Sequence, residues 1–218
     1  MTLAIFDLDN TLIAGDSDHA WGDFLVNKGL VDSDSYKATN DAFYEDYKAG
    51  QLDIVAYQEF ALEPLTRFDP DELQALHREF MACKIAPMRL AKADRLLRKH
   101  RNQGDTLMII TATNKFVTEP IAEMLKVEHL IATEGEVDPR GRYTGKLRGT
   151  PSYGAGKVER LKAWMCKNGQ DLNGSYFYSD SHNDLPLLRL VTFPVAVDPD
   201  STLQEETRRR DWPVISLR

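Results

Sequence analysis

Three short apolar runs, each followed at once by a polar residue, constrain the fold more than any other feature of this sequence. They are Leu3–Phe6 before Asp7, Leu107–Ile110 before Thr111, and Tyr176–Tyr178 before Ser179-Asp180. Continuous apolar runs of this length, separated by helix-like segments, are typical of strands buried on both faces of a parallel sheet. We therefore predict an α/β protein with a Rossmann-like, doubly wound parallel sheet.

Helix, strand and turn signals between and after these runs predict the rest of the core. They indicate a strand at Val191–Val197, with Pro194 at an edge or a bulge. They indicate helices at Ala91–His100 and Lys157–Lys167, and a third helix that opens at Thr118 with Pro120 in its first turn. They also indicate a turn at Asp138–Gly141 between two short strands.

A segment of different character interrupts the alternation of strands and helices. Residues 14–88 are rich in acidic and aromatic side chains and contain no convincing strand. The helices predicted there are Ser17–Lys28, Asp34–Ala49, Asp53–Leu62 and Asp69–Cys83. We therefore predict an α-helical cap of residues 14–88, inserted after the first strand of an α/β core made of residues 1–13 and 89–218.

The composition narrows the choice of partner. The 218 residues carry 27 Lys and Arg against 34 Asp and Glu, a net charge of −7, so the basic surface needed for nucleic-acid binding is not expected. No apolar run approaches the roughly 18 residues of a membrane span. Cys83 and Cys166 are isolated, which argues against a disulfide framework or a zinc site and suits a cytoplasmic protein. A small-molecule partner is expected, and the oligomeric state does not follow from the sequence.

Acidic residues collect where the strands are predicted to end. Ligands of open parallel sheets bind at the carboxyl ends of the strands, so Asp7, Thr111 and Asp180 are expected to converge, with Asp9 and Asp184 in the adjoining loops. Asp7 and Asp9 stand one residue apart, and two such charges are costly to bury unless a loop solvates them or a cation neutralises them. Both explanations remain open for this pair alone. Clustered carboxylates without histidines favour a hard cation, and Mg²⁺ suits a site with few protein ligands.

In this order, the motifs resemble those of the haloacid dehalogenase-like phosphatases. The matching residues are Asp7-Leu8-Asp9-Asn10-Thr11, Thr111, Lys157 and Asp180-Ser181-His182-Asn183-Asp184. The likeness covers nearly the whole chain, and the helical insertion resembles the small cap of the phosphoserine phosphatase-like branch. The resemblance implies a magnesium-dependent phosphomonoesterase that works through an aspartyl-phosphate.

The resemblance also implies a role for each residue that acts on the phosphoryl group. Asp7 is expected to be the nucleophile. Asp9 is expected to protonate the leaving alkoxide and then to activate water. Thr111 and Lys157 are expected to bind the phosphoryl oxygens through a hydroxyl and a positive charge.

The same resemblance implies a magnesium site. The metal is expected to be held by Asp7, the backbone carbonyl of Asp9, and Asp180. Asn183 and Asp184 are expected to orient the waters of the metal or the catalytic lysine.

Substrate choice is predicted from the start of the cap. Phosphoserine phosphatases place a Glu soon after the first motif to bind the substrate ammonium, whereas this chain has Asp16 and Asp18. Both acids, together with Ala112 and Thr113 after the second motif, are expected to contact the substrate. An amino-alcohol phosphate such as histidinol phosphate is the leading expectation, which would place the enzyme in amino-acid biosynthesis.

Other functions remain open on the sequence alone. Phosphoserine is one alternative substrate, and a phosphotransferase or mutase built on the same motifs is another possibility. A phospho-accepting receiver module also gathers acids, a Thr and a Lys over a parallel sheet, although it has no evident need for Asp9 or for a large helical insertion.

The five histidines are not predicted to take part in the chemistry. His182 is interpreted as a residue of the site rim. The others, His19, His77, His100 and His129, lack partners at ligand spacing and are interpreted as surface or structural residues.

Overall fold

Six parallel strands form the sheet at the centre of the fold. In the computed structural model, which describes residues 2–218, their order is β3-β2-β1-β6-β7-β8. The strands are β1 (Leu3–Phe6), β2 (Thr106–Asn114), β3 (His129–Thr133), β6 (Tyr176–Ser179), β7 (Phe193–Val197) and β8 (Val214–Ile215). Because β1 pairs with both β2 and β6, the polar residues after the three apolar runs meet at one edge of the sheet.

The alternation of side chains along β1 explains why helices cover both faces of the sheet. Ala4 and Phe6 belong to one buried apolar cluster, which they share with α5 (Ala91–Asn102) and α6 (Lys115–Met124). The opposite face contributes Leu3 and Ile5 to a second cluster. That cluster includes residues of α7 (Ala155–Asn168), α8 (Leu185–Leu188) and α9 (Ser201–Arg210). The predicted doubly wound α/β fold is confirmed.

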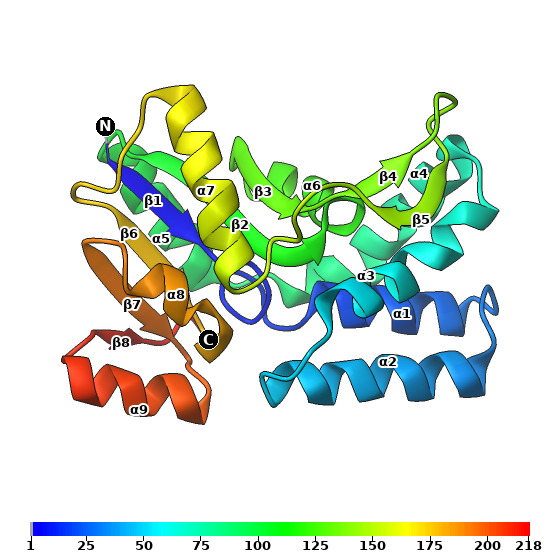
Figure 1. Cartoon of the computed structure of the whole chain (residues 1–218), viewed down its shortest axis with the longest axis horizontal. Helices are drawn as coiled ribbons and strands as arrows, with labels where there is room; N and C mark the ends of the chain where they lie inside the picture. Colours follow the sequence, from blue (N-terminus) through cyan, green and yellow to red (C-terminus); the bar gives the residue numbers. More distant parts are fainter. Residues whose placement is uncertain (1) are drawn as a thin grey trace.

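A helical insertion lies between β1 and β2. It consists of α1 (Ser17–Asn27), α2 (Ser33–Lys48), α3 (Ile54–Leu62), a 3₁₀ turn (Glu63–Arg67), α4 (Pro70–Phe80), a π turn (Met81–Ile85) and a 3₁₀ turn (Ala86–Met88). In Figure 1 the arrow of β1 points towards the side of the molecule where α1, α2 and α3 lie. Ile13 and Arg89 pair in antiparallel fashion, so the chain leaves and re-enters the core at neighbouring points. The exact limits of the cap, residues 14–88, remain a prediction.

The insertion is joined to the rest of the fold by apolar contacts at two places. Trp21 of α1 packs edge-on against Phe80 of α4 and Phe116 of α6. The antiparallel hairpin of β4 (Gly135–Val137) and β5 (Tyr143–Leu147) contacts α3. Its turn contains the predicted residues 138–141. Within residues 2–218, no helix has both the length and the apolar character required to cross a membrane.

The start of α6 differs from the prediction. The helix begins at Lys115, so Pro120 stands inside it and not in its first turn. The reason is the side chain of Asn114, which caps the helix by accepting a hydrogen bond from the backbone N–H of Val117 (3.2 Å), so that the helix begins three residues before Thr118. Strand β2 runs on to this cap, so Thr111 lies within the strand and not after its end.

Strands β3 and β8 were not predicted, and the predicted edge position holds for Pro194 itself but not for the whole of β7. Strand β3 begins with two half-buried residues and β8 has only two residues, so neither produces a continuous apolar run. Strand β7 is not an edge strand, because it pairs with β6 and with β8. The pairing with β8 starts at Ala196, however, and Pro194 therefore has a strand on one side only.

Candidate active site

The first loop of the site is tied to the loop after β6. The backbone N–H of Asp7 donates to the carbonyl of Tyr178 (2.8 Å), which extends the pairing of β1 and β6 by one residue. Thr11, which is fully buried, donates its hydroxyl to Asp180 Oδ1 (3.0 Å) and accepts from the backbone N–H of Asp180 (3.1 Å). These bonds hold the carboxyl-bearing loops of two neighbouring strands together.

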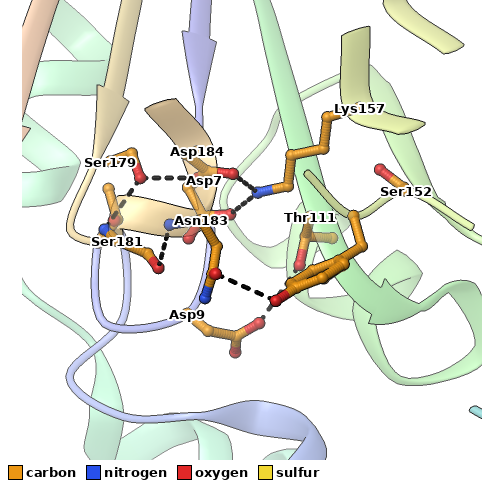
Figure 2. Close-up of polar contacts among 12 residues, drawn as sticks. Asp7, Asp9, Thr111, Ser152, Lys157, Ser179, Ser181, Asn183 and Asp184 are labelled. Carbon is orange, nitrogen blue, oxygen red and sulfur yellow. Dashed lines mark hydrogen bonds and ion pairs between the residues drawn. The ribbon is translucent and has the colours of Figure 1, made fainter. Parts of the chain in front are cut away.

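Lys157 joins the carboxylates at the centre of the site. Its Nζ lies 2.7 Å from Asp7 Oδ1 and 2.7 Å from Asp184 Oδ1, and all three side chains are buried (Figure 2). Burial alone lowers the pKa of Lys157, but Asp184 and Asp7 outweigh it and the pKa is raised. The lysine is therefore a fixed positive charge inside the protein.

The position of Lys157 depends on the small residue before it. A β-carbon at Gly156 would collide with the carbonyl oxygen of Pro151. Glycine therefore allows the first turn of α7 to lie against the preceding loop. This close approach places Lys157 at the ends of β1 and β6.

Negative charge exceeds positive charge around this lysine. Burial raises the pKa of Asp7 well above its usual value; Lys157 opposes the shift, while Asp184, Asp180 and Asp9 add to it. Burial, followed by the charge of Asp184, raises the pKa of Asp180 to about 7. A cation beside Asp7 and Asp180 would relieve both effects.

The donor set suits magnesium better than a metal that needs a complete protein cage. In the described part of the chain, residues 2–218, no three His, Cys, Asp or Glu side chains converge closely enough to hold a metal by themselves. Magnesium is commonly bound by one or two carboxylates while it keeps several waters and contacts substrate phosphate. Asp7 and Asp180, which follow the neighbouring strands β1 and β6, provide two such carboxylates.

Asp9 faces β2 and the start of α1. Its Oδ2 accepts hydrogen bonds from the hydroxyls of Thr113 (2.8 Å) and Thr111 (3.3 Å). Its Oδ1 accepts from the backbone N–H of Ser17 (2.6 Å). The structure thus brings Asp9 together with Thr111 and Thr113, which lie about a hundred residues later in the sequence.

The loop after β6 makes two further links. Ser179 donates to Asp184 Oδ2 (2.7 Å) and fixes the carboxylate that contacts the lysine. Asn183 accepts from the hydroxyl of Tyr153 (3.0 Å) and donates to the carbonyl of Tyr47 (3.1 Å) at the end of α2. The predicted supporting residues thus contact both the core and the helical insertion.

A pocket opens between these motifs and the insertion. It encloses about 500 Å³, including open solvent at its mouth, and its floor is formed by Asp7, Asp9, Thr111, Ala112 and Thr113. Its apolar and aromatic walls are Phe43, Tyr44, Tyr47, Leu52, Ile54 and Tyr57, and its other polar residues are Asp16, Asp18, His19, Asn40 and Gln58. The combination of apolar walls with a few convergent polar groups is typical of a small-molecule site.

The two acids predicted to contact substrate lie in this pocket, each in a defined environment. Asp16 caps α1 by accepting from the backbone N–H of His19 (2.8 Å), and burial with the nearby Asp9 raises its pKa to about 7. Asp18 accepts from Asn114 Nδ2 (3.1 Å) and Gln58 Nε2 (3.3 Å), and burial raises its pKa well above the usual value. A cationic ligand would stabilise the ionised form of both carboxyls.

Comparison with known proteins identifies the family. The model described as haloacid dehalogenase-like hydrolase matches residues 4–189, most of the chain. The chain belongs to the haloacid dehalogenase-like hydrolases.

One curated relative of this hydrolase and two solved structures illustrate the likeness. A protein of Neisseria meningitidis serogroup C (strain 8013) named "Histidinol-phosphatase" is 47% identical, with 99% of each chain covered. A crystal structure of a protein of unknown function from Bordetella pertussis Tohama I has a TM-score of 0.93 and 45% identity, with both chains covered completely. A substrate-bound phosphoserine phosphatase structure has a TM-score of 0.70 at 16% identity, covers 94% of this chain and 90% of that one, and shares the fold.

Several residues of this hydrolase's pocket were not singled out from the sequence. His19, which was interpreted as a surface or structural residue, lines the pocket and bonds Asp41 Oδ1 (2.9 Å). Phe43 and Tyr47 stand four residues apart on α2, a spacing that also fits the internal core of a cap. Gln58 carries no sequence signal, because only the packing of α3 against β2 brings it to the site.

Proposed function

We propose that this hydrolase is a phosphatase that transfers the phosphoryl group of a small monoester to Asp7 and then to water. The observation that carries the proposal is the buried contact between Lys157 Nζ and Asp7 Oδ1 (2.7 Å), because Asp7 also lines the pocket. An anionic nucleophile repels an anionic phosphate, and a fixed ammonium beside it reduces that repulsion.

In the proposed mechanism, two side chains bind the phosphoryl group. The Lys157 ammonium and the Thr111 hydroxyl donate to its non-bridging oxygens. The hydroxyl of Thr111 already lies among polar groups, since it contacts Asp9 Oδ2 and accepts from the backbone N–H of Thr113 (3.2 Å). The reaction centre thus provides oriented donors before substrate arrives.

The chemistry requires one nucleophile and one proton carrier. Asp7 attacks phosphorus, the bond to the substrate oxygen breaks, and a proton from Asp9 neutralises the leaving alkoxide. Asp9, now a carboxylate, removes a proton from water, which attacks phosphorus and releases inorganic phosphate and free Asp7. Asp184 keeps the lysine in place throughout through its own 2.7 Å contact.

We also propose that the enzyme requires Mg²⁺, held by Asp7, the backbone carbonyl of Asp9, and Asp180. When bound, the metal supplies positive charge that offsets the repulsion between nucleophile and phosphate. Asp7 and Asp180 suit this role because Asp7 is buried, Asp180 is half-buried, and both have raised pKa values in the protein alone. Asn183 is proposed to position a water of the metal.

Histidinol phosphate is the proposed substrate, which would make the protein a cytoplasmic enzyme of amino-acid biosynthesis. Asp16 and Asp18 in the pocket favour a substrate with a positive charge, and Tyr44 and Tyr57 are suited to stack on a flat ring. The 47% identical relative named "Histidinol-phosphatase" supports the same choice. Phosphoserine is the alternative substrate, and transfer to an alcohol in place of water is the alternative reaction.

Phosphate release from a panel of monoesters tests the proposal. The panel contains histidinol phosphate, phosphoserine, sugar phosphates and nucleotides, each with and without Mg²⁺, for wild type and Asp7→Asn. The expected result is fastest release from histidinol phosphate, dependent on both Mg²⁺ and Asp7. Faster turnover of phosphoserine would replace the substrate, and a long-lived phosphoryl-enzyme without release would favour a receiver or transferase.

A further inference from the structure

The side chain of Gln58 has a buried oxygen without a hydrogen-bond donor. Gln58 lies on α3, is fully buried and lines the pocket. Its Nε2 donates to Asp18 Oδ2 (3.3 Å) and to the carbonyl of Ala112 (3.2 Å), so both amide hydrogens are used. Within residues 2–218, no group donates to its Oε1. Leaving a buried acceptor of this kind without a donor destabilises the protein.

The orientation of this amide is determined by its neighbours. If the amide were reversed, its oxygen would face the carbonyl of Ala112, which can only accept. Asp18 is itself held by Asn114, whose Nδ2 donates to the other carboxylate oxygen (3.1 Å). The Gln58 oxygen is therefore a fixed acceptor without a donor among residues 2–218, on a side chain that lines the pocket.

The location of Gln58 relates this acceptor to the reaction centre. Ala112, which receives one amide hydrogen, directly follows Thr111, which we assign to phosphoryl binding. Asp16 and Tyr57 line the same pocket. A nitrogen a few bonds from the phosphate could therefore meet an amide oxygen, a carboxylate and an aromatic ring together.

We propose that Gln58 is a specificity-determining residue whose Oε1 accepts a hydrogen bond from an N–H of the substrate's amine or imidazole group. Asp18 is a positioning residue that holds the amide with its oxygen towards this donor. This inference rests on the proposed phosphatase function and specifies how the same site selects nitrogen-bearing monoesters. A site built to accept a hydrogen bond discriminates strongly against ligands that lack the donor.

Steady-state kinetics of Gln58→Met test the proposal. Met has a similar length but neither an amide oxygen nor an amide N–H group. The substrates are histidinol phosphate and p-nitrophenyl phosphate, a monoester without an N–H group. Gln103→Leu, at an exposed position after α5, is the matched control. For Gln58→Met we expect KM for histidinol phosphate to rise about 10- to 100-fold, a clearly larger loss than the loss for p-nitrophenyl phosphate.

Gln58→Glu separates the acceptor from the rest of the amide, because it keeps an oxygen at this position. Its KM for histidinol phosphate should rise less than that of Gln58→Met. Equal losses with both substrates would overturn the proposal, since they would mean that Gln58 only supports the pocket. Wild-type turnover of p-nitrophenyl phosphate but of no nitrogen-bearing monoester would refute the inference and leave a phosphatase. No turnover of any monoester would refute the proposed function, and the inference with it.

Discussion

Replacing Lys157 with Met tests the electrostatic account of the site most severely. The substitution removes the one ammonium that contacts both Asp7 and Asp184, at 2.7 Å each, and leaves two buried carboxyls beside each other. Breaking a buried ion pair by removing one partner costs about 3–5 kcal/mol. For a protein of this size the melting temperature falls by about 2–4 °C per kcal/mol, so a loss of about 6–20 °C is expected at pH 8.

The loss of stability should depend on pH. Burial already raises the pKa of Asp7, and removal of Lys157 raises it further because the opposing charge is gone. The folded variant therefore takes up protons as pH falls, which favours folding, and its deficit against wild type should shrink between pH 8 and pH 5.

Thermal unfolding at several pH values measures this effect. Lys167→Met, an exposed change on the same helix, is the control and should match wild type at every pH. Adding Asp184→Asn to Lys157→Met should restore part of the melting temperature at pH 8. Equal melting temperatures of Lys157→Met and wild type at pH 8, or a deficit that does not change with pH, would refute the reasoning.

Three other substitutions probe the cap, the second loop and the backbone. Because the pKa of Asp16 is raised to about 7, the fold loses stability as pH rises from the unfolded pKa of an Asp towards 7, so Asp16→Asn, which keeps a capping side chain, should exceed the melting temperature of wild type by more at pH 8 than at pH 5; an offset equal at both pH values would contradict this. Tyr153→Phe removes the hydroxyl that donates to Asn183 (3.0 Å) and should raise the Mg²⁺ concentration for half-maximal activity about tenfold. An unchanged Mg²⁺ concentration would show that this hydrogen bond does not support metal binding. Gly156→Ala should lower the free energy of unfolding by about 1–3 kcal/mol and reduce activity, because its β-carbon would collide with the Pro151 carbonyl. Wild-type stability together with wild-type activity would show that this collision does not occur.

The centre of the sheet could be predicted from the sequence because its strands are buried on both faces. Such strands must be apolar throughout, and a polar residue at their ends is then conspicuous. Asp7, Thr111 and Asp180 were predicted to converge for this reason, and the structure brings them to neighbouring strands. Their chemical roles remain predictions.

The remaining differences arise where local signals are weak or compete. Pro120 is a strong signal for a first helical turn, but the Asn114 cap upstream determines where α6 begins. Strand β8 is too short to give any periodicity. Gln58 and His19 reach the pocket only because the insertion packs against the core, a tertiary contact that no sequence window contains.

Trapping the phosphoryl-enzyme tests whether Asp7 is the residue that receives the phosphoryl group. Asp9→Asn should slow hydrolysis of the intermediate, because Asp9 is proposed to activate the attacking water. The variant is mixed with Mg²⁺ and p-nitrophenyl phosphate, whose p-nitrophenolate leaves without a proton from Asp9, and is then quenched in acid and analysed by peptide mass spectrometry. The account predicts one added phosphoryl group on the peptide that contains Asp7, and none when Asp7→Asn is added to the variant. A phosphoryl group on another residue, or phosphate release by wild type without a phosphorylated Asp7 in either enzyme, would contradict it.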